Sequence, residues 1–295
     1  MRQSIQWLTD KYLLHLERMV EAEQAAAATL RQRKSLLTRL CQHKTDDGDE
    51  YGEMSLNAPS AAFVKVRDAR AATPAEADNM IKAARSMYHW ACDAGHAEVN
   101  PLVGIKKIHR SKGGATPWTS EDLCKFKKTH PIGTMAHLAL TLHMFTGARS
   151  NDAIWLGRKQ EFESHGTRWL GWQPKKRGAA FVEIPMAAPL RESINAVARI
   201  GDAYILSKHG NPFKNADSYR NWFRKRCDEA DLQGRSSHGV RKALAELLAE
   251  EGCSEHQIMA VLSHTQPSTS AIYTKGADRR AMAAEAMRSI RGFSW

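Results

Sequence analysis

The spacing of apolar residues predicts a mainly helical chain. In residues 3–40 apolar positions recur at steps of three or four, which is the period of an amphipathic helix, and the alanine run at 25–28 strongly favours helix. The sequence therefore predicts one long helix over 3–40. Residues 45–60 combine acidic side chains with glycine and proline, which indicates a loop or a weakly ordered insertion.

A second helix is predicted from residue 74 to about residue 94. Thr73 suits its N-cap, Glu76 follows three residues later as in a capping box, and Pro74 takes the first helical position, where its missing N–H costs nothing. The apolar stripe of this helix is interpreted as core. Its members are Met80, Ala84, Met87, Trp90 and Ala91.

The second part of the chain combines further helices with a β-hairpin. A helix begins after Thr119 or Ser120, and a strongly apolar helix over 135–145 ends at Gly147. Arg149 therefore lies near the start of the next helix. Backbone N–H groups and the helix dipole favour an anion at that position. Further helices are predicted over 189–200, 215–230, 240–251 and 254–262. The alternating pattern over 168–185 is interrupted by basic residues and predicts a hairpin with a basic tip. The predicted fold class is mainly α with a small β-sheet or hairpin (α+β).

A basic and then glycine-containing segment follows residue 101 and is the best candidate for a linker. We therefore predict a helical domain at 1–110, a linker at 111–117 and a second domain at 118–295.

Composition and charge narrow the class of protein. Of the 295 residues, 42% are hydrophobic and 25% charged, which is typical of a globular protein. The formal net charge of +11 favours a polyanionic partner, either nucleic acid or an anionic membrane surface. Residues 1–110 hold 16 basic and 14 acidic side chains, whereas 111–295 hold 27 and 18, so the second part is the stronger polyanion binder.

The cysteines and the N-terminus point to the cytoplasm. The five cysteines form no C-x-x-C pair, so neither a disulfide framework nor a zinc site is indicated. No signal-peptide pattern and no apolar stretch of about 18 residues is present, and no membrane partner is expected.

The candidate chemistry lies in an ordered set of arginines, histidines and one tyrosine. Arg149 ends the run TGAR, Arg241 ends HGVR, His264 follows 23 residues later, and Tyr273 follows His264 by nine. Two guanidinium groups suit the two non-bridging oxygens of a phosphodiester, because each is always charged and donates paired hydrogen bonds. Clustered cations also favour the phenolate of a tyrosine whose ordinary pKa is about 10. A tyrosyl phosphoester would conserve the energy of the broken bond, so that the strand can be resealed without ATP.

The motifs in residues 116–295 resemble those of the catalytic domain of the tyrosine recombinase, or phage integrase, family. The resemblance rests on TGAR at 146–149 with Asp152, HGVRK at 238–242, LSH at 262–264, and Tyr273 followed by threonine. Residues 74–108 also resemble the end of the helical core-binding domain that precedes the catalytic domain in this family.

The resemblance implies a role for each motif residue. Tyr273 is the expected nucleophile, Arg149 and Arg241 form the phosphate clamp, and His238 and His264 donate hydrogen bonds or move protons. The family places the acid for the leaving 5′-oxygen on the hairpin.

Two hairpin lysines suit this last role. Lys176, followed by Arg177 and Gly178, fits the family pattern best, but the distance to residues 184–185 is longer than usual, which leaves Lys175 as the alternative.

Two further positions have an open interpretation. Asp152 lies one helical turn after Arg149, so it either orients Arg149 or a catalytic histidine, or is an ordinary exposed helix charge. Ser263 replaces the glycine commoner in the family, a change that is tolerated if the backbone there is not in a glycine-only conformation. The chemistry requires no metal or cofactor, and the absence of an acidic D-x-D cluster agrees with that.

The resemblance implies a site-specific recombinase or integrase that works through a 3′-phosphotyrosyl intermediate on double-stranded DNA. Four active sites are needed, so a homotetramer on two DNA sites with a Holliday-junction intermediate is expected. No extra N-terminal arm-binding domain is recognised, which indicates either core sites only or accessory proteins that bend DNA or control direction. The alternatives are a type IB topoisomerase-like relaxing enzyme and a non-catalytic DNA-binding regulator.

The tail after Tyr273 has an apolar helical face that either docks on a neighbouring protomer or packs on its own domain. Its members are Ala281, Met282, Ala284, Ala286, Met287 and Ile290.

Overall fold

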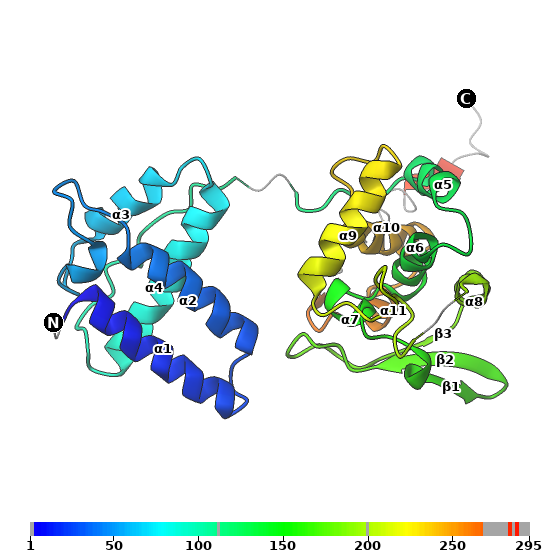
Figure 1. The fold of residues 1–295 in the computed structure, drawn as a ribbon, viewed down its shortest axis with the longest axis horizontal. Coiled ribbons are helices and arrows are strands. Elements are labelled where there is room, and N and C mark those ends of the chain that lie inside the picture. The colour runs from blue at the N-terminus through cyan, green and yellow to red at the C-terminus, as the bar shows by residue number, and fades with distance from the viewer. Residues whose placement is uncertain (1–2, 111–112, 199–200, 268–282, 285–286, 289–295) are drawn as a thin grey trace. The chain divides into compact units, whose positions relative to one another are not determined.

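The chain divides into two compact units, residues 1–112 and 113–295, in a computed structural model (Figure 1). The structure describes residues 3–110, 113–198, 201–267, 283–284 and 287–288. The roles assigned to residues 1–110 and 118–295 stay predictions.

The first unit is a small helical domain built on its own core. Its elements are α1 (Ile5–Glu21), α2 (Ala27–Cys41), the 3-10 turn η1 (Tyr51–Glu53), α3 (Ser60–Ala69) and α4 (Pro74–Asp93). Helix α4 packs against the other three helices, and Leu8, Leu37, Phe63 and Met87 are completely buried between them. The stripe predicted as core on α4 is therefore confirmed, with Trp90 partly buried at its edge.

The single helix predicted over 3–40 is wrong, because the chain breaks into α1 and α2. Helix α1 ends at Glu21 with Ala22 as its C-cap, Glu23 has a positive φ of 56°, and the Ala25 N–H donates to the Met19 carbonyl at 3.0 Å. Even for alanine, the best helix former, intrinsic preference is worth less than about 1 kcal/mol per residue. The apolar stripes of α1 and α2 gain more by packing on each other and on α4. Tertiary packing therefore overrides the propensity of the alanine run.

Of the two alternatives expected for residues 45–60, a loop or a weakly ordered insertion, the structure shows a loop that contains η1 and leads into α3. It holds a bridge between Lys44 and Glu50, and both Tyr51 and Leu56 are buried at 4% exposure. The Tyr51 and Leu56 side chains anchor the loop in the core despite its acidic composition.

Helix α4 begins where predicted but lacks the predicted capping box. Pro74 is its first residue, yet the Thr73 side chain makes no cap hydrogen bond. Glu76 instead lies 2.5 Å from a guanidinium nitrogen of Arg39, so its carboxylate joins α4 to α2.

The second unit surrounds the buried helix α6. Its helices are α5 (Ser120–Thr129), α6 (Met135–Thr146), α7 (Ser150–Ala153), the 3-10 turn η2 (Arg158–Gln160), α8 (Ala188–Ala196), α9 (Ala216–Glu229), α10 (Ser237–Glu250) and α11 (Glu255–Leu262). Helix α6 contacts α8, α9 and α10. Its apolar residues are buried almost all round, as expected of a central helix.

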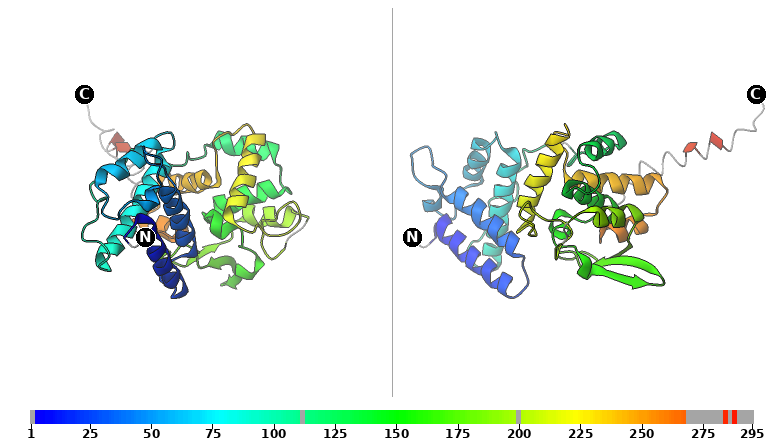
Figure 2. Two further views of the ribbon diagram at one scale, coloured as in Figure 1. Left: turned by 60° about the vertical axis from the view of Figure 1, so that its left-hand side comes forward. Right: turned by 45° about the vertical axis from the view of Figure 1, so that its right-hand side comes forward.

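A three-stranded antiparallel sheet lies at one edge of this unit (Figures 1 and 2). Its strands are β1 (Glu161–Ser164), β2 (Thr167–Trp172) and β3 (Val182–Pro185). The predicted hairpin corresponds to β2 and β3, paired with Leu170 opposite Ile184, and both of these side chains face the core. Strand β1 was not predicted. Its turn to β2 uses His165 and Gly166, both with positive φ, and histidine is a weak sequence signal for that conformation. With helices predominating around one small sheet, the predicted α+β class is confirmed.

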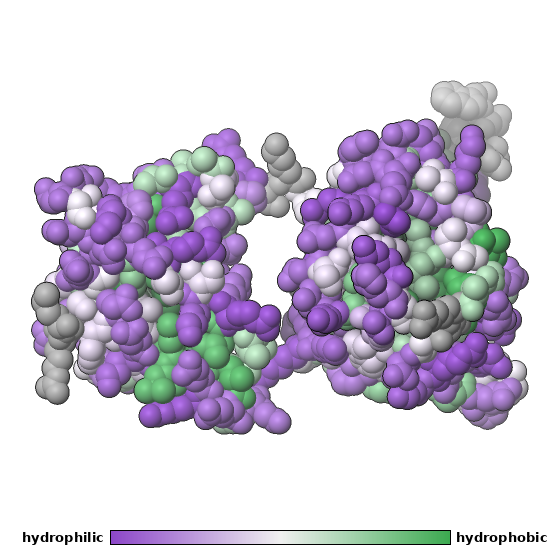
Figure 3. All heavy atoms as spheres, viewed as in Figure 1, coloured by the Kyte–Doolittle hydropathy of each residue, from purple (hydrophilic) through white to green (hydrophobic). Residues whose placement is uncertain are grey.

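The visible surface of both units is mainly hydrophilic (Figure 3). An apolar area lies over α1, where Leu14 is 45% exposed. Within the described parts of the chain, no helix combines the length and the apolar character needed to span a membrane.

Candidate active site

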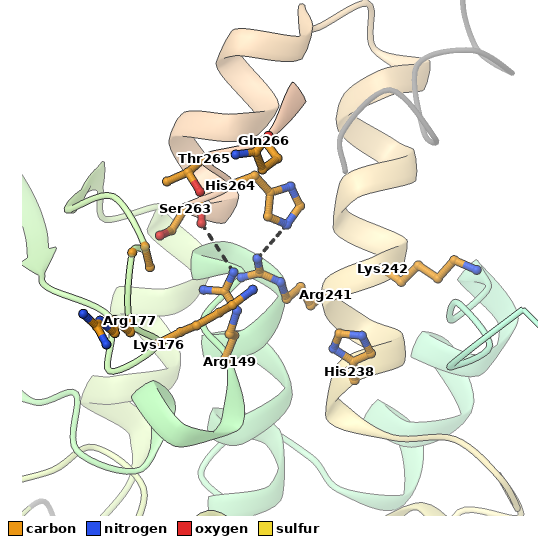
Figure 4. A pocket seen from close by; sticks show the side chains of 12 residues that line it. Arg149, Lys176, Arg177, His238, Arg241, Lys242, Ser263, His264, Thr265 and Gln266 are labelled. Carbon is orange, nitrogen blue, oxygen red and sulfur yellow. Dashed lines mark hydrogen bonds between the residues drawn. The ribbon is translucent and has the colours of Figure 1, made fainter. Parts of the chain in front are cut away.

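Five of the six predicted catalytic side chains line one pocket of the second unit (Figure 4). Arg149 comes from the start of α7, Lys176 from the β2–β3 loop, His238 and Arg241 from the start of α10, and His264 from the segment after α11. The pocket has a volume of about 270 Å³, which is too small for most drug-sized ligands but sufficient for a phosphate group. The sixth residue, Tyr273, lies outside the described residues.

Arg149 is placed by a tight turn after α6. Gly147 ends the helix with φ 60°, and a Cβ atom on it would lie 2.6 Å from a Leu262 methyl carbon and 3.2 Å from one of Leu244. Only glycine satisfies both the conformation and the space. The Thr146 hydroxyl oxygen accepts from the Ala148 N–H at 3.0 Å and closes the turn. Because α7 has only four residues, the predicted help from its dipole is small.

Arg241 joins the turn before Arg149 to the end of α11. The side chain is 6% exposed, and its guanidinium donates to the carbonyls of Gly147 and Leu262. Its Nη2 also lies 3.0 Å from His264 Nε2 (Figure 4). A guanidinium can only donate, so His264 Nε2 accepts and its ring is neutral in this arrangement.

The start of α10 is held against the segment 116–118. Ser236 caps the helix, and its carbonyl accepts from Trp118 Nε1 at 3.0 Å. A Cβ atom on Gly239 would lie 2.3 Å from the Thr116 carbonyl oxygen. This close approach fixes the end of α10 from which His238 and Arg241 reach the pocket.

Burial and neighbouring cations lower the pKa of both pocket histidines. For His264 burial is the largest cause, Arg241 and Arg149 add to it, and the pKa falls to about 4. The pKa of His238 is lowered first by burial and then by the same two arginines. Both rings are therefore neutral near pH 7. A phosphate in the pocket would oppose the effect of the arginines and raise both pKa values.

The two hairpin lysines differ in where they point. Lys176 extends toward the two guanidinium groups (Figure 4). The Lys175 ammonium lies 5.6 Å from the centre of the Trp155 ring, in a cation–π contact, and Lys175 is not among the described residues that line the pocket. Of the two lysines, Lys176 is therefore the one that lines the pocket.

Asp152 is buried, with 1% of its surface exposed, so it is not an ordinary exposed helix charge. Its Oδ1 accepts from the Lys175 backbone N–H at 2.8 Å. Burial raises the pKa of its carboxyl, whereas the Lys175 hydrogen bond and the Arg149 guanidinium act in the opposite direction. Asp152 thus holds the β2–β3 loop beside the turn that carries Arg149.

His143 is a supporting residue that the sequence analysis missed. It is completely buried in α6, with Nδ1 2.9 Å from the Ala148 carbonyl oxygen and Nε2 2.7 Å from the Tyr219 hydroxyl. A carbonyl only accepts, so Nδ1 carries the proton and Nε2 accepts from Tyr219. Burial lowers the pKa of His143 to about 4. The available signal was a histidine within an otherwise apolar helix.

No carboxylate side chain is among the described residues that line the pocket. Across the described ranges of the chain, no group of three or more His, Cys, Asp or Glu side chains has the arrangement of a metal site. The pocket therefore offers positive charge and hydrogen-bond donors, the complement of an anionic group.

The second unit matches a known protein family in its sequence. The sequence profile described as "Phage integrase family" matches residues 116–280. No protein with a curated description matches the sequence.

Solved structures show the same fold at low sequence identity. A lambda integrase dimer bound to a COC′ core site is 17% identical, with a TM-score of 0.72 over 97% of this chain and 78% of that one. A lambda integrase tetramer bound to a Holliday junction is 17% identical, with a TM-score of 0.70 over 88% of this chain and 77% of that one. The Tn1549 transposon integrase in complex with circular intermediate DNA is 14% identical, with a TM-score of 0.70 over 95% of this chain and 99% of that one.

Proposed function

Because the chain belongs to the phage integrase family, we propose that it is a site-specific recombinase that breaks and rejoins DNA through a 3′-phosphotyrosyl intermediate. The supporting observation is the convergence of Arg149, Arg241, Lys176 and two neutral histidines on one pocket whose described lining residues include no carboxylate. Cations held this close repel one another unless an anion lies between them. A phosphodiester of DNA has the charge and the size to be that anion.

In the proposed reaction the two arginines bind the non-bridging oxygens of the scissile phosphate. The Tyr273 oxygen attacks phosphorus, and the bond from phosphorus to the 5′-oxygen breaks. Lys176 gives a proton to that oxygen, which leaves as a 5′-hydroxyl, while the tyrosine proton passes to a neutral histidine or to water. The arginines also stabilise the charge of the pentacoordinate transition state, usually the largest catalytic contribution.

Rejoining reverses these steps with a different strand. A 5′-hydroxyl from the partner site attacks the phosphorus of the 3′-phosphotyrosyl bond and returns its proton to Lys176. The bond from phosphorus to the Tyr273 oxygen breaks, and Tyr273 takes back a proton from the histidine or from water. The number of covalent phosphate bonds is unchanged, so no ATP is consumed. Exchange between two duplexes needs four such sites, and a homotetramer on two DNA sites supplies them.

Double-stranded DNA is the proposed partner of both units. The lambda integrase tetramer is bound to a Holliday junction, and the fold similarity to the lambda integrase dimer extends over 97% of this chain, which includes the first unit. We assign residues 1–110 the role of a core-binding domain and residues 118–295 that of the catalytic domain. The +11 net charge supports binding to DNA phosphates in general.

The test is capture of the covalent complex. The full chain is incubated with genomic DNA fragments that include the region flanking its gene, the reaction is stopped with detergent, and DNA ends bound to protein are sequenced. We expect adducts at discrete sites, with blocked 3′ ends and free 5′-hydroxyls.

The matched control is Tyr273→Phe, which removes only the phenolic oxygen. It should form no adduct and still bind the captured sites. An adduct that persists in this variant, or that links to 5′ ends, contradicts the proposal. Two captured sites on one plasmid should give recombinant product, whereas relaxed plasmid alone would identify a topoisomerase-like enzyme.

A further inference from the structure

Ser263 adopts a backbone conformation that normally favours glycine. It ends α11 with φ 50° and ψ 47°, in the left-handed region, and is 4% exposed. An L side chain is strained there, and glycine is not. The serine is thus present in a conformation that favours glycine without being exclusive to it. Its hydroxyl is the feature that glycine would lack.

This hydroxyl connects the end of α11 to the β2–β3 loop. Ser263 Oγ donates to the Ala180 carbonyl oxygen at 2.7 Å. The Ser263 carbonyl oxygen, on the other side, accepts from Arg149 Nη2 at 3.4 Å, and the next residue is His264 (Figure 4). One buried residue thus contacts the loop, the phosphate clamp and the histidine segment.

The loop that Ser263 holds is the one that carries Lys176. Near its start, the Lys175 N–H donates to Asp152 at 2.8 Å, and near its end Ala180 accepts from Ser263. Lys176 lies between these two attachments. The three basic residues 175–177 are exposed, so burial of these side chains does not fix the position of Lys176.

We propose that Ser263 is a positioning residue that fixes the β2–β3 loop so that Lys176 reaches the leaving oxygen. The inference rests on the proposed function, because the role of Lys176 does. Asp152 ties the loop to the element that carries Arg149, and Ser263 ties it to the element that carries His264. Losing either tie lets the lysine move relative to the phosphate clamp.

Limited proteolysis tests the tie without DNA. Trypsin cleaves after lysine and arginine, so residues 175–177 report on the loop, and Lys208, in an exposed turn of the same unit, is the internal reference. In Ser263→Ala and Ser263→Gly we expect cleavage at 175–177 to accelerate about two- to tenfold relative to Lys208, the range for loss of one hydrogen bond. Alanine keeps the backbone strain and glycine removes it. Agreement between the two variants assigns the effect to the hydroxyl.

Covalent capture tests the catalytic consequence on a site identified for the wild type. Each Ser263 variant should form the 3′-phosphotyrosyl adduct about two- to tenfold more slowly, with the DNA concentration at half-saturation unchanged. In a Lys176→Ala background the same substitution should cause no further loss. A DNA substrate with sulfur in place of the bridging 5′-oxygen should restore the wild-type rate to the Ser263 variants, because a thiolate leaves without a proton.

Three outcomes would overturn the inference: unchanged loop proteolysis, an unchanged rate of adduct formation, or a rate loss of equal size with and without Lys176. The last would mean a general structural defect. If Ser263→Ala does not fold, Ser263→Gly carries the test, since glycine adopts the left-handed backbone freely. If the wild type forms no adduct, the proposed function fails. The Ser263 tie would still be shown if trypsin cleaves residues 175–177 slowly in the wild type and faster in the Ser263 variants.

Discussion

Buried His143 should make the stability of the protein fall steeply below neutral pH. Its ring is completely buried and donates to the Ala148 carbonyl while accepting from Tyr219. The substitutions His143→Leu and Tyr219→Phe, made together, test this dependence. Together they remove the titrating group and the hydroxyl that would otherwise lose its partner.

The magnitude follows from the lowered pKa. Burial takes the pKa of His143 from 6.5 to about 4, so between these values the unfolded chain binds a proton that the folded protein does not. The stabilisation is complete above pH 6.5 and is lost as the pH falls toward 4. Between pH 6.5 and pH 4 this effect lowers the free energy of unfolding by about 3 kcal/mol, and about 2 kcal/mol of that is already lost at pH 5.

Urea unfolding of the full chain at pH 7.5 and at pH 5 measures the effect. The double variant starts less stable, because the Ala148 carbonyl loses its donor at a cost of about 1–3 kcal/mol. Between the two pH values the wild type should lose about 2 kcal/mol more than the double variant. His209→Gln, at an exposed position in the same unit, is the control and should keep the wild-type dependence. Equal losses in wild type and double variant would mean that His143 does not cause this pH dependence.

Three further substitutions test the pocket. Arg149→Lys keeps the charge but loses the planar pair of donors, and the rate of adduct formation in the capture assay should fall about 10²–10³-fold. Gly147→Ala places a Cβ atom 2.6 Å from Leu262 in a left-handed backbone, and should lower the free energy of unfolding in urea by about 2–4 kcal/mol. Gln266→Glu puts a carboxylate among the cations of the pocket; it should raise the melting temperature and weaken DNA binding in a filter assay, while Gln266→Leu should do neither.

The sequence predicted those elements whose signals are local. The apolar helix that became α6 ends at Gly147 because glycine is the residue that a left-handed helix end favours, and Thr119 caps α5 in a capping box with Asp122. The break after α1 was missed for the opposite reason. The break forms because α2 folds back and buries Leu37 against other helices. The helix propensity of neighbouring residues carries no information about such a contact.

In the site, too, some features could be predicted from the sequence and others depend on the fold. Motif order named the side chains that converge in the pocket, because their chemical types are specific even when they are far apart in the chain. Asp152 and His143 act instead through backbone groups, namely the Lys175 N–H and the Ala148 carbonyl. A sequence does not show which backbone group a side chain will meet, so such supporting contacts require the folded structure.

The supporting contacts also explain how the pocket stays positive. Arg241 is oriented by the carbonyls of Gly147 and Leu262 and by the neutral ring of His264, and Arg149 by the Ser263 carbonyl. These neutral acceptors fix a guanidinium in place without cancelling its charge, as a carboxylate would. The nearby Asp152 carboxylate is instead engaged by a backbone N–H. The folded protein therefore holds like charges together, and their repulsion lowers its stability. A bound phosphate offsets the repulsion between the cations, and it does so most in the transition state, where the negative charge on the phosphate grows.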